Sequence, residues 1–246
     1  MKIYPRPDTY YKNKSSLNFD MMRSKVYLER KNSKEGAYLW LAHVICGIIM
    51  AFLTFLLMFA EDNLTKIRVK TVQHLLDTNS NAVSAYFWYA GSAIVFVLIA
   101  TLLTVYVGPG ANGSGVVEVM GMLNGINYPD TIGFKTLFVK CVALILAVTG
   151  GLCIGKEGPL VHIGANVGIM TCYLPFEFCK YLQNDVIKRQ MMACGASCGV
   201  AVAFGSPIGG ALFSYEISKP NTFWTFSMLW RVFTATSIAT FVLAIL

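Results

Sequence analysis

A lysine and a glutamate stand side by side within a glycine-rich stretch of an otherwise apolar sequence. The stretch, residues 150–168, reads GGLCIGKEGPLVHIGANVG and contains Lys156 and Glu157. Its first seven residues match the G-x-x-x-x-G-K part of a phosphate-binding loop. Such a loop continues with Ser or Thr, which holds a magnesium ion, whereas Glu157 places a carboxylate there that repels phosphate. We therefore reject a nucleotide site and consider a different ligand.

Two glycine-rich stretches lie where helices should begin, which predicts an anion site. The second stretch, residues 108–118, reads GPGANGSGVVE. A helix N-terminus carries about half a positive charge and several unpaired N–H groups, and glycine lets an ion approach them. Ser114 adds a hydroxyl donor, Lys156 a nearby positive charge, and Glu157 a tethered carboxylate that competes with a mobile anion. The alternative is that Glu157 only stabilises its helix, paired to Lys156.

The composition places the chain in a bilayer. Of its 246 residues, 55% are hydrophobic and 13% are charged, whereas roughly a quarter of the residues in a soluble domain are charged. The net charge of +7 does not indicate a nucleic-acid partner, because nearly half of the Lys and Arg residues lie in a tail at 1–35, before the first apolar run. A basic tail beside an apolar span predicts a cytosolic N-terminus, with a solvated tail favoured over one that binds lipid headgroups.

Long apolar segments come first in the chain, and short ones follow. Residues 37–60 and 82–107 are each long enough to cross a hydrocarbon core of about 30 Å. Between them we expect a polar loop at 61–81, which contains a glycosylation sequon at Asn63. Further helices, interrupted by Gly and Pro, are predicted at about 114–124, 133–149, 157–170, 186–203, 208–218 and 223–246. Short helices that end inside a bilayer are typical of transporter and channel sites.

Three pairs of glycines with a spacing of four residues predict close helix packing. They are Gly164 and Gly168, Gly195 and Gly199, and Gly205 and Gly209. Small residues at this spacing let two helix backbones approach each other in lipid. Packing is a sufficient explanation for these glycines, and we assign them no chemistry.

Metal, redox and enzyme chemistry find little support in the sequence. The seven cysteines lie in or beside apolar segments without a CxxC pair, as expected of small buried side chains. Cys194 and Cys198 share a helix face, but two thiols do not make a metal site. We see no nucleophile–base pair, metal cluster or dinucleotide fingerprint, so we expect no enzyme activity, no metal and no cofactor.

Three motifs resemble those of the CLC family of chloride channels and chloride/proton exchangers. GSGVVE at 113–118 is similar to the family's GSGIPE, and GKEGPLVH at 155–162 to its GKEGP or GREGP signature. VAFGSPIGGALFSYE at 202–216 is similar to its AAFG-PxGGxLFSxE. The resemblance spans about 36–246 and is strongest to the endosomal and lysosomal branch. It implies an all-α multi-pass membrane fold with tilted and broken helices, and a transmembrane domain at 36–246 that forms the first of two inverted repeats.

The resemblance also implies roles for the residues of the predicted anion site. Ser114 would coordinate the central anion through its hydroxyl, and Glu157 would be the gate that alternates between blocking the outer site and facing solution. The transported ion would be chloride, because a serine at the position of Ser114 accompanies chloride in the family. The residues that would surround the anion are Gly113, Ser114, Gly115, Lys156, Glu157 and Gly158.

Three departures from the family pattern bear on function. Val117 stands where the family usually has Pro, which presets a helix start, so we expect a less preorganised site. Ile217 stands where exchangers carry an inner proton-accepting glutamate, and an aliphatic residue there favours a channel. The resemblance implies a second repeat, and often cytosolic nucleotide-binding domains, but neither is found before Leu246. We expect a fragment or a half-length protein.

Together these features predict a voltage-gated chloride channel, in which anions cross passively under the control of a glutamate gate. One alternative is a chloride/proton antiporter of endosomal or lysosomal type, because water can replace a side chain in a proton path. Another is a truncated, non-conducting subunit that regulates a full-length relative. We expect a homodimer or a dimer with such a relative, surrounded by membrane lipid, in an endosomal, lysosomal, vacuolar or plasma membrane.

Overall fold

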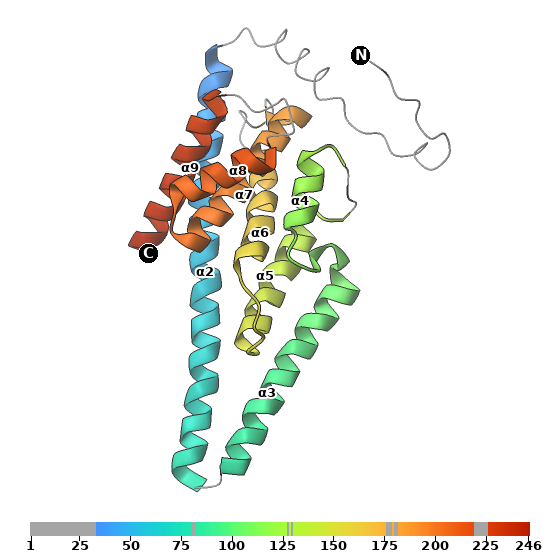
Figure 1. Cartoon of the computed structure of the whole chain (residues 1–246), viewed down its shortest axis with the longest axis vertical. Coiled ribbons are helices and arrows are strands. Elements are labelled where there is room, and N and C mark those ends of the chain that lie inside the picture. The colour runs from blue at the N-terminus through green and yellow to red at the C-terminus, as the bar shows by residue number, and fades with distance from the viewer. Residues whose placement is uncertain are drawn as a thin grey trace, which may run out of the picture.

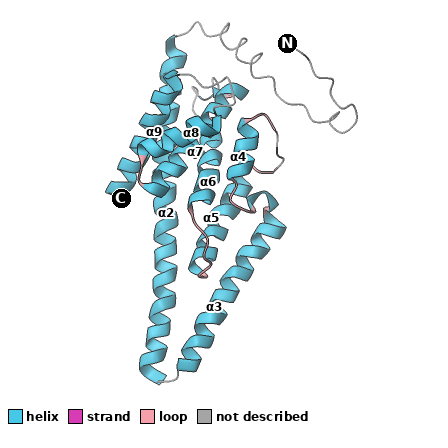
Figure 2. Cartoon of the chain, viewed as in Figure 1, coloured by secondary structure: helices cyan, strands magenta, loops and turns pink. Residues whose placement is uncertain are grey.

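The computed structural model describes residues 33–79, 82–126, 128, 130–175, 179, 182–218 and 226–246. Within these residues the long elements are all helices, joined by short turns (Figure 2). They are α2 (Ser33–Asn79), α3 (Ala82–Leu102), α4 (Val116–Leu123), α5 (Phe134–Thr149), α6 (Glu157–Thr171), α7 (Asp185–Phe204), α8 (Pro207–Ser218) and α9 (Phe226–Ile245). The predicted all-α fold is confirmed, and α4 to α9 begin and end close to the predicted positions. Most of the predicted basic tail lies outside the described residues.

The first helix is much longer than the sequence suggested. The predicted polar loop at 61–81 is wrong, because α2 continues through it without interruption and has 47 residues, about 70 Å at 1.5 Å per residue. Residues 48–79 contain neither Gly nor Pro, so nothing in the sequence breaks the helix. Asn63 is therefore an exposed helical residue rather than a loop residue. In Figure 1 the far half of α2 and the start of α3 form an arm that extends beyond the other helices.

A buried arginine holds this arm against the rest of the fold. Arg68 of α2 donates from Nε to the Ser92 hydroxyl at 3.0 Å and from one terminal nitrogen to the Tyr89 carbonyl at 2.9 Å, both on α3. Its other terminal nitrogen donates to the carbonyl of Thr149, the last residue of α5. A cation is favourable beside the partial negative charge of a helix C-terminus. Arg68 thus fixes the end of α5, from which the chain turns toward Glu157.

Helices α6 and α7 form the tightest contact, and glycines make it. A methyl group on Gly164 would overlap the Gly195 carbonyl, and one on Gly195 would lie 2.8 Å from the carbonyl carbon of Gly164. Gly168 and Gly199 likewise face backbone atoms of the opposite helix. The first two predicted glycine pairs therefore work together, as close backbone packing in lipid requires.

The third predicted pair behaves differently. Gly205 ends α7 in the left-handed conformation with φ 63°, a conformation that glycine adopts without strain. Gly210, and not Gly209, packs against the α7 backbone, where a methyl group would collide with the Ser197 carbonyl. The prediction of a helix contact at Gly205 and Gly209 is therefore wrong. α8 does pack closely on α7, but through Gly210, one residue after Gly209.

Among the described residues, three helices are long and apolar enough to cross a membrane: Gly36–Thr78 within α2, Ala82–Val107, which continues α3, and Phe226–Ile245, which is α9. Helices α6, α7 and α8 gather beside α2 and α9 in Figure 1, and α6 and α7 are largely buried. Helix α6 thus has protein rather than lipid around much of its length, as its start within the fold requires.

Candidate anion site

The two glycine-rich stretches meet in the structure. Ser114, just before α4, packs against Gly158 in the first turn of α6, and a methyl group on Gly158 would overlap the Ser114 hydroxyl. Although 44 residues separate them, the predicted hydroxyl donor and one of the predicted amide donors are therefore neighbours. Only glycine at 158 leaves room for this approach.

Both helix N-termini at this contact have no side-chain cap. α4 has Gly115 at the N-cap position, which has no side chain, and α6 has Lys156, whose ammonium has no acceptor atom to offer. The first N–H groups of a helix have no partner within the helix itself. The third residue of α6, Pro159, has no N–H. The N–H groups of Glu157 and Gly158 are therefore the donors that α6 offers to an anion.

The loop that carries Ser114 is shaped by two left-handed glycines. Gly113 has φ 65° and Gly115 has φ 83°, conformations that side chains disfavour. Gly115 also has no space for a side chain, because a methyl group would collide with the His162 ring. α4 begins normally at Val116, although Val117 stands where the motif that it resembles has proline and is 72% exposed. The helix start therefore forms without that proline.

A buried lysine that sequence reasoning missed holds the same loop from behind. Lys140 of α5 is 4% exposed, and its ammonium donates to the carbonyls of Ala111 at 2.9 Å and Gly113 at 2.7 Å, with Asn112 at 3.5 Å. These bonds turn successive carbonyl oxygens, which would repel an anion, toward a cation. The signal was available: Lys140 is a charge in the middle of an apolar helical run, where an ionisable residue is a functional candidate.

Two polar residues on α6 connect the site to the loop before α5. His162 Nε2 lies 2.9 Å from the Thr131 carbonyl, and a carbonyl can only accept, so Nε2 carries the proton. Asn166, one turn later, accepts from the Gly133 N–H at 2.8 Å and donates to the His162 carbonyl at 3.0 Å. Since His162 also packs on Gly115, one helix face positions both the start of α5 and the start of α4.

The Glu157 carboxylate folds back toward its own loop. It is half-buried, and a methyl group on Gly155 would overlap its Oε2. Lys156 does not pair with it, because the Lys156 ammonium lies 3.8 Å from Glu61 Oε2 on α2. Within the described part of the chain Glu157 has no ion-pair partner. The alternative in which Glu157 is a structural acid held by Lys156 is therefore not what the structure shows.

The remaining predicted position, Ile217, lies apart from this cluster near the end of α8. It is 5% exposed and belongs to the apolar core, whereas the preceding Glu216 is exposed. An aliphatic side chain there is fully accounted for by packing and offers no titratable atom.

A small cavity adjoins the site on the side of α3 and α5. Its volume is about 180 Å³, and its lining includes Gly113, Lys140 and Pro159 beside apolar residues of α3 and α5. The loop before α4 and the first turn of α6 therefore border a space large enough for water or small ions.

Comparison with known proteins assigns the family. The family model described as voltage gated chloride channel matches residues 91–246, well over half of the chain. The chain belongs to the CLC family. The match includes all three motifs on which the resemblance rests, and it includes Ser114, Lys140 and Glu157. The predicted family is confirmed.

CLC relatives and solved structures cover most of the chain. Chloride channel protein C of Dictyostelium discoideum is 31% identical over 98% of this chain and 33% of its own length. The human H(+)/Cl(-) exchange transporter 7 is 30% identical over 93% of this chain and 30% of its own length. A eukaryotic CLC transporter structure matches with a TM-score of 0.75 and 25% identity, covering 85% of this chain and 38% of its own. The chain thus spans about a third of the length of these relatives.

Proposed function

We propose that the chain forms one side of a gated chloride pathway, as part of a voltage-gated chloride channel. The observation that carries this proposal is the contact between Ser114 and Gly158, which joins the uncapped N-termini of α4 and α6. An anion there meets a hydroxyl, backbone N–H groups and two helix dipoles of favourable sign. The buried Lys140 adds a positive charge behind the loop.

Glu157 acts as the gate. Its carboxylate begins α6 without an ion-pair partner among the described residues, so it is drawn to the same N–H groups as chloride. Its side chain contacts the glycine loop at Gly155, which gives it room to turn aside. Protonation removes its charge and its advantage over chloride, so acid pH opens the pathway.

Passive conduction is favoured over exchange by Ile217, which has no proton to give. The second candidate is a chloride/proton exchanger, and similarity favours it: relatives of this chain include proteins named as H(+)/Cl(-) exchange transporters and a cyanobacterial Cl-/H+ antiporter of known structure, with a TM-score of 0.72 and 26% identity. Because water can replace a side chain in a proton path, a direct measurement has to separate the two.

The assembly follows from the incomplete enclosure of the site. Gly113 and Ser114 are exposed in this chain, so further protein must cover an anion held there. We propose that a second repeat of the fold supplies this cover. The protein as a whole is expected to form a homodimer or a dimer with a full-length relative. The expected location is an endosomal, lysosomal, vacuolar or plasma membrane, with the N-terminus in the cytosol. A truncated regulatory subunit would show no current of its own.

The reversal potential distinguishes a channel from an exchanger. The full-length protein is recorded at fixed chloride concentrations while the pH gradient is varied. A passive channel follows the chloride gradient alone, so its reversal potential does not move with pH. A systematic shift with the pH gradient, which disappears in Glu157→Ala, would show coupled transport and replace the channel by the exchanger.

A further inference from the structure

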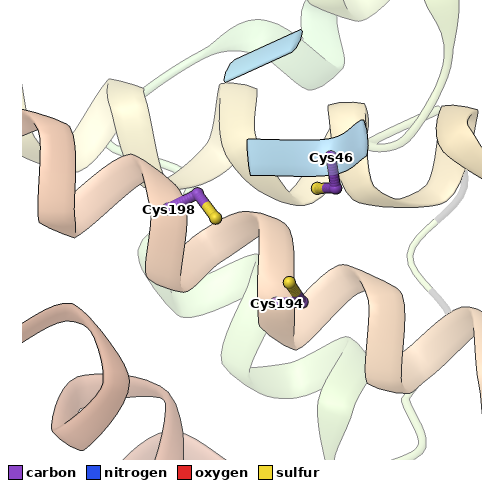
Figure 3. Close-up of side chains that lie close together, drawn as sticks. All are labelled: Cys46, Cys194 and Cys198. Carbon is purple, nitrogen blue, oxygen red and sulfur yellow. The ribbon is translucent and has the colours of Figure 1, made fainter. Parts of the chain in front are cut away.

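Three cysteines from two distant parts of the sequence meet between α2 and α7. Cys46 belongs to α2, and Cys194 and Cys198 lie one turn apart on α7 (Figure 3). Their sulfur atoms all lie within 4.8 Å of one another, and each residue is 0% exposed. All three are free thiols. The pair on α7, which alone makes no metal site, thus gains a third ligand from α2.

The backbone packing of both helices fixes the position of this cluster. On α7, Gly195 and Gly199 press against α6, so the cysteine that precedes each of them faces elsewhere, toward α2. On α2, Gly47 packs against the Ala235 carbonyl of α9, and Cys46 before it faces α7. The close contacts of α7 with α6 and of α2 with α9 thus hold the thiols in place.

We propose that Cys46, Cys194 and Cys198 bind a soft monovalent metal ion, Cu(I). Thiolates select soft ions such as Cu(I), zinc and iron–sulfur clusters. Zinc takes four ligands, whereas among the described residues no further His, Cys, Asp or Glu side chain joins these three. Cu(I) accepts three sulfur ligands, which fits the number available.

The geometry of the three sulfurs allows this ion. Three sulfurs at about 2.3 Å from a central metal lie about 4 Å apart, so the thiols need to approach one another by less than about 1 Å, which side-chain rotation supplies. Cysteine binds metals as the thiolate, so binding releases protons: Cu⁺ and three thiols give one three-thiolate copper complex and three H⁺, with no oxidant required. Because the site is fully buried, the ion enters only when α2 and α7 separate locally, so binding is slow.

The test uses the full-length protein, purified without oxygen and supplied with Cu(I) as its acetonitrile complex. We expect Cys46→Ala and Cys198→Ala each to lose one copper per chain relative to the unmodified protein, after competition with a Cu(I) chelator. Cys141→Ala is the matched control, because Cys141 is a half-buried thiol on α5, outside the cluster, and it should retain all copper. The copper-loaded protein should also melt at a higher temperature, since the ion joins α2 to α7.

X-ray absorption of the unmodified, copper-loaded protein provides a readout that needs no variant. Three sulfur neighbours at about 2.3 Å support the site. Equal copper content in Cys46→Ala, or nitrogen and oxygen neighbours around the copper, would overturn it. A disulfide between Cys46 and either α7 cysteine in the anaerobic protein would overturn it too, because oxidised sulfurs cannot ligate as thiolates.

Discussion

The α6–α7 contact and the anion site share a helix but are built on opposite principles. Along α6, Gly164 and Gly168 bring backbone against backbone, and both glycines are buried. At the start of the same helix, Glu157 and Gly158 leave N–H groups without an internal partner and half exposed. The first region is held by close packing, and the second is kept open for a ligand.

The difference shows how the fold makes an unsatisfied site stable. Helix ends whose N–H groups have no partner make folding less favourable. The rigid regions around them offset this loss of stability. The glycine interface fixes the axis of α6, Arg68 fixes the end of α5, and His162 and Lys140 hold the loop at Ser114. A mutation in the rigid region should therefore affect folding, whereas one at the site should affect transport.

The largest effect is expected at the helix interface. In Gly195→Ala the new methyl group would lie 2.8 Å from the Gly164 carbonyl carbon and 2.9 Å from the Gly168 nitrogen, backbone atoms that cannot turn away. We expect a destabilisation of about 3 kcal/mol or more, seen as loss of monodisperse protein and a lower melting temperature in detergent. Gly91→Ala on α3 is the control, because no atom lies within 4 Å of its new methyl. An unchanged melting temperature for Gly195→Ala would contradict the backbone contact.

The next largest effect is expected from the buried lysine behind the anion site. Lys140→Met keeps an apolar stem but leaves the carbonyls of Ala111 and Gly113 without their donor, at a cost of about 1–3 kcal/mol. Because these carbonyls can then turn toward the anion, we expect chloride conductance to fall about tenfold. The exposed Lys135→Met on the same helix serves as the control. Full conductance in Lys140→Met would remove Lys140 from the account of the site.

A smaller effect is expected from the hydroxyl at the centre of the site. Ser114→Pro should shift selectivity from chloride toward nitrate by up to about tenfold, because one neutral donor contributes roughly 0.5–1.5 kcal/mol. Ser114→Ala separates the loss of the hydroxyl from the stiffer backbone that proline imposes. The measurement is the reversal potential in mixed chloride and nitrate. If neither variant changes it, Ser114 is not a ligand.

Local patterns in the sequence predicted most helices well. Glycines and prolines between apolar runs placed α4 to α9, and the motif spacing placed Ser114 and Glu157 at helix starts. The far half of α2 was missed because its charged residues suggested a loop, although residues 48–79 contain no helix breaker. Arg68, which lies in the segment predicted as a polar loop, is buried against α3 and α5.

Contacts between distant segments could not be predicted in this way. Lys156 and Glu157 are neighbours in sequence, yet Lys156 reaches Glu61 on another helix. Cys46 lies beside Cys198 although 152 residues separate them, and no local sequence pattern predicts that these two side chains are close in space. Such pairs depend on how helices pack, which only the assembled fold determines.

The central claim is that Glu157 competes with chloride for the N–H groups at the start of α6. The most direct test is to record chloride current from Glu157→Ala in the full-length protein over a range of voltage and pH. Alanine keeps the helix start and deletes the competitor, so the current should flow at all voltages and no longer increase at acid pH. Glu61→Gln, which changes a carboxylate that the structure pairs with Lys156 instead, should keep normal gating. If Glu157→Ala gates as the unmodified protein does, the carboxylate at the start of α6 is not the gate.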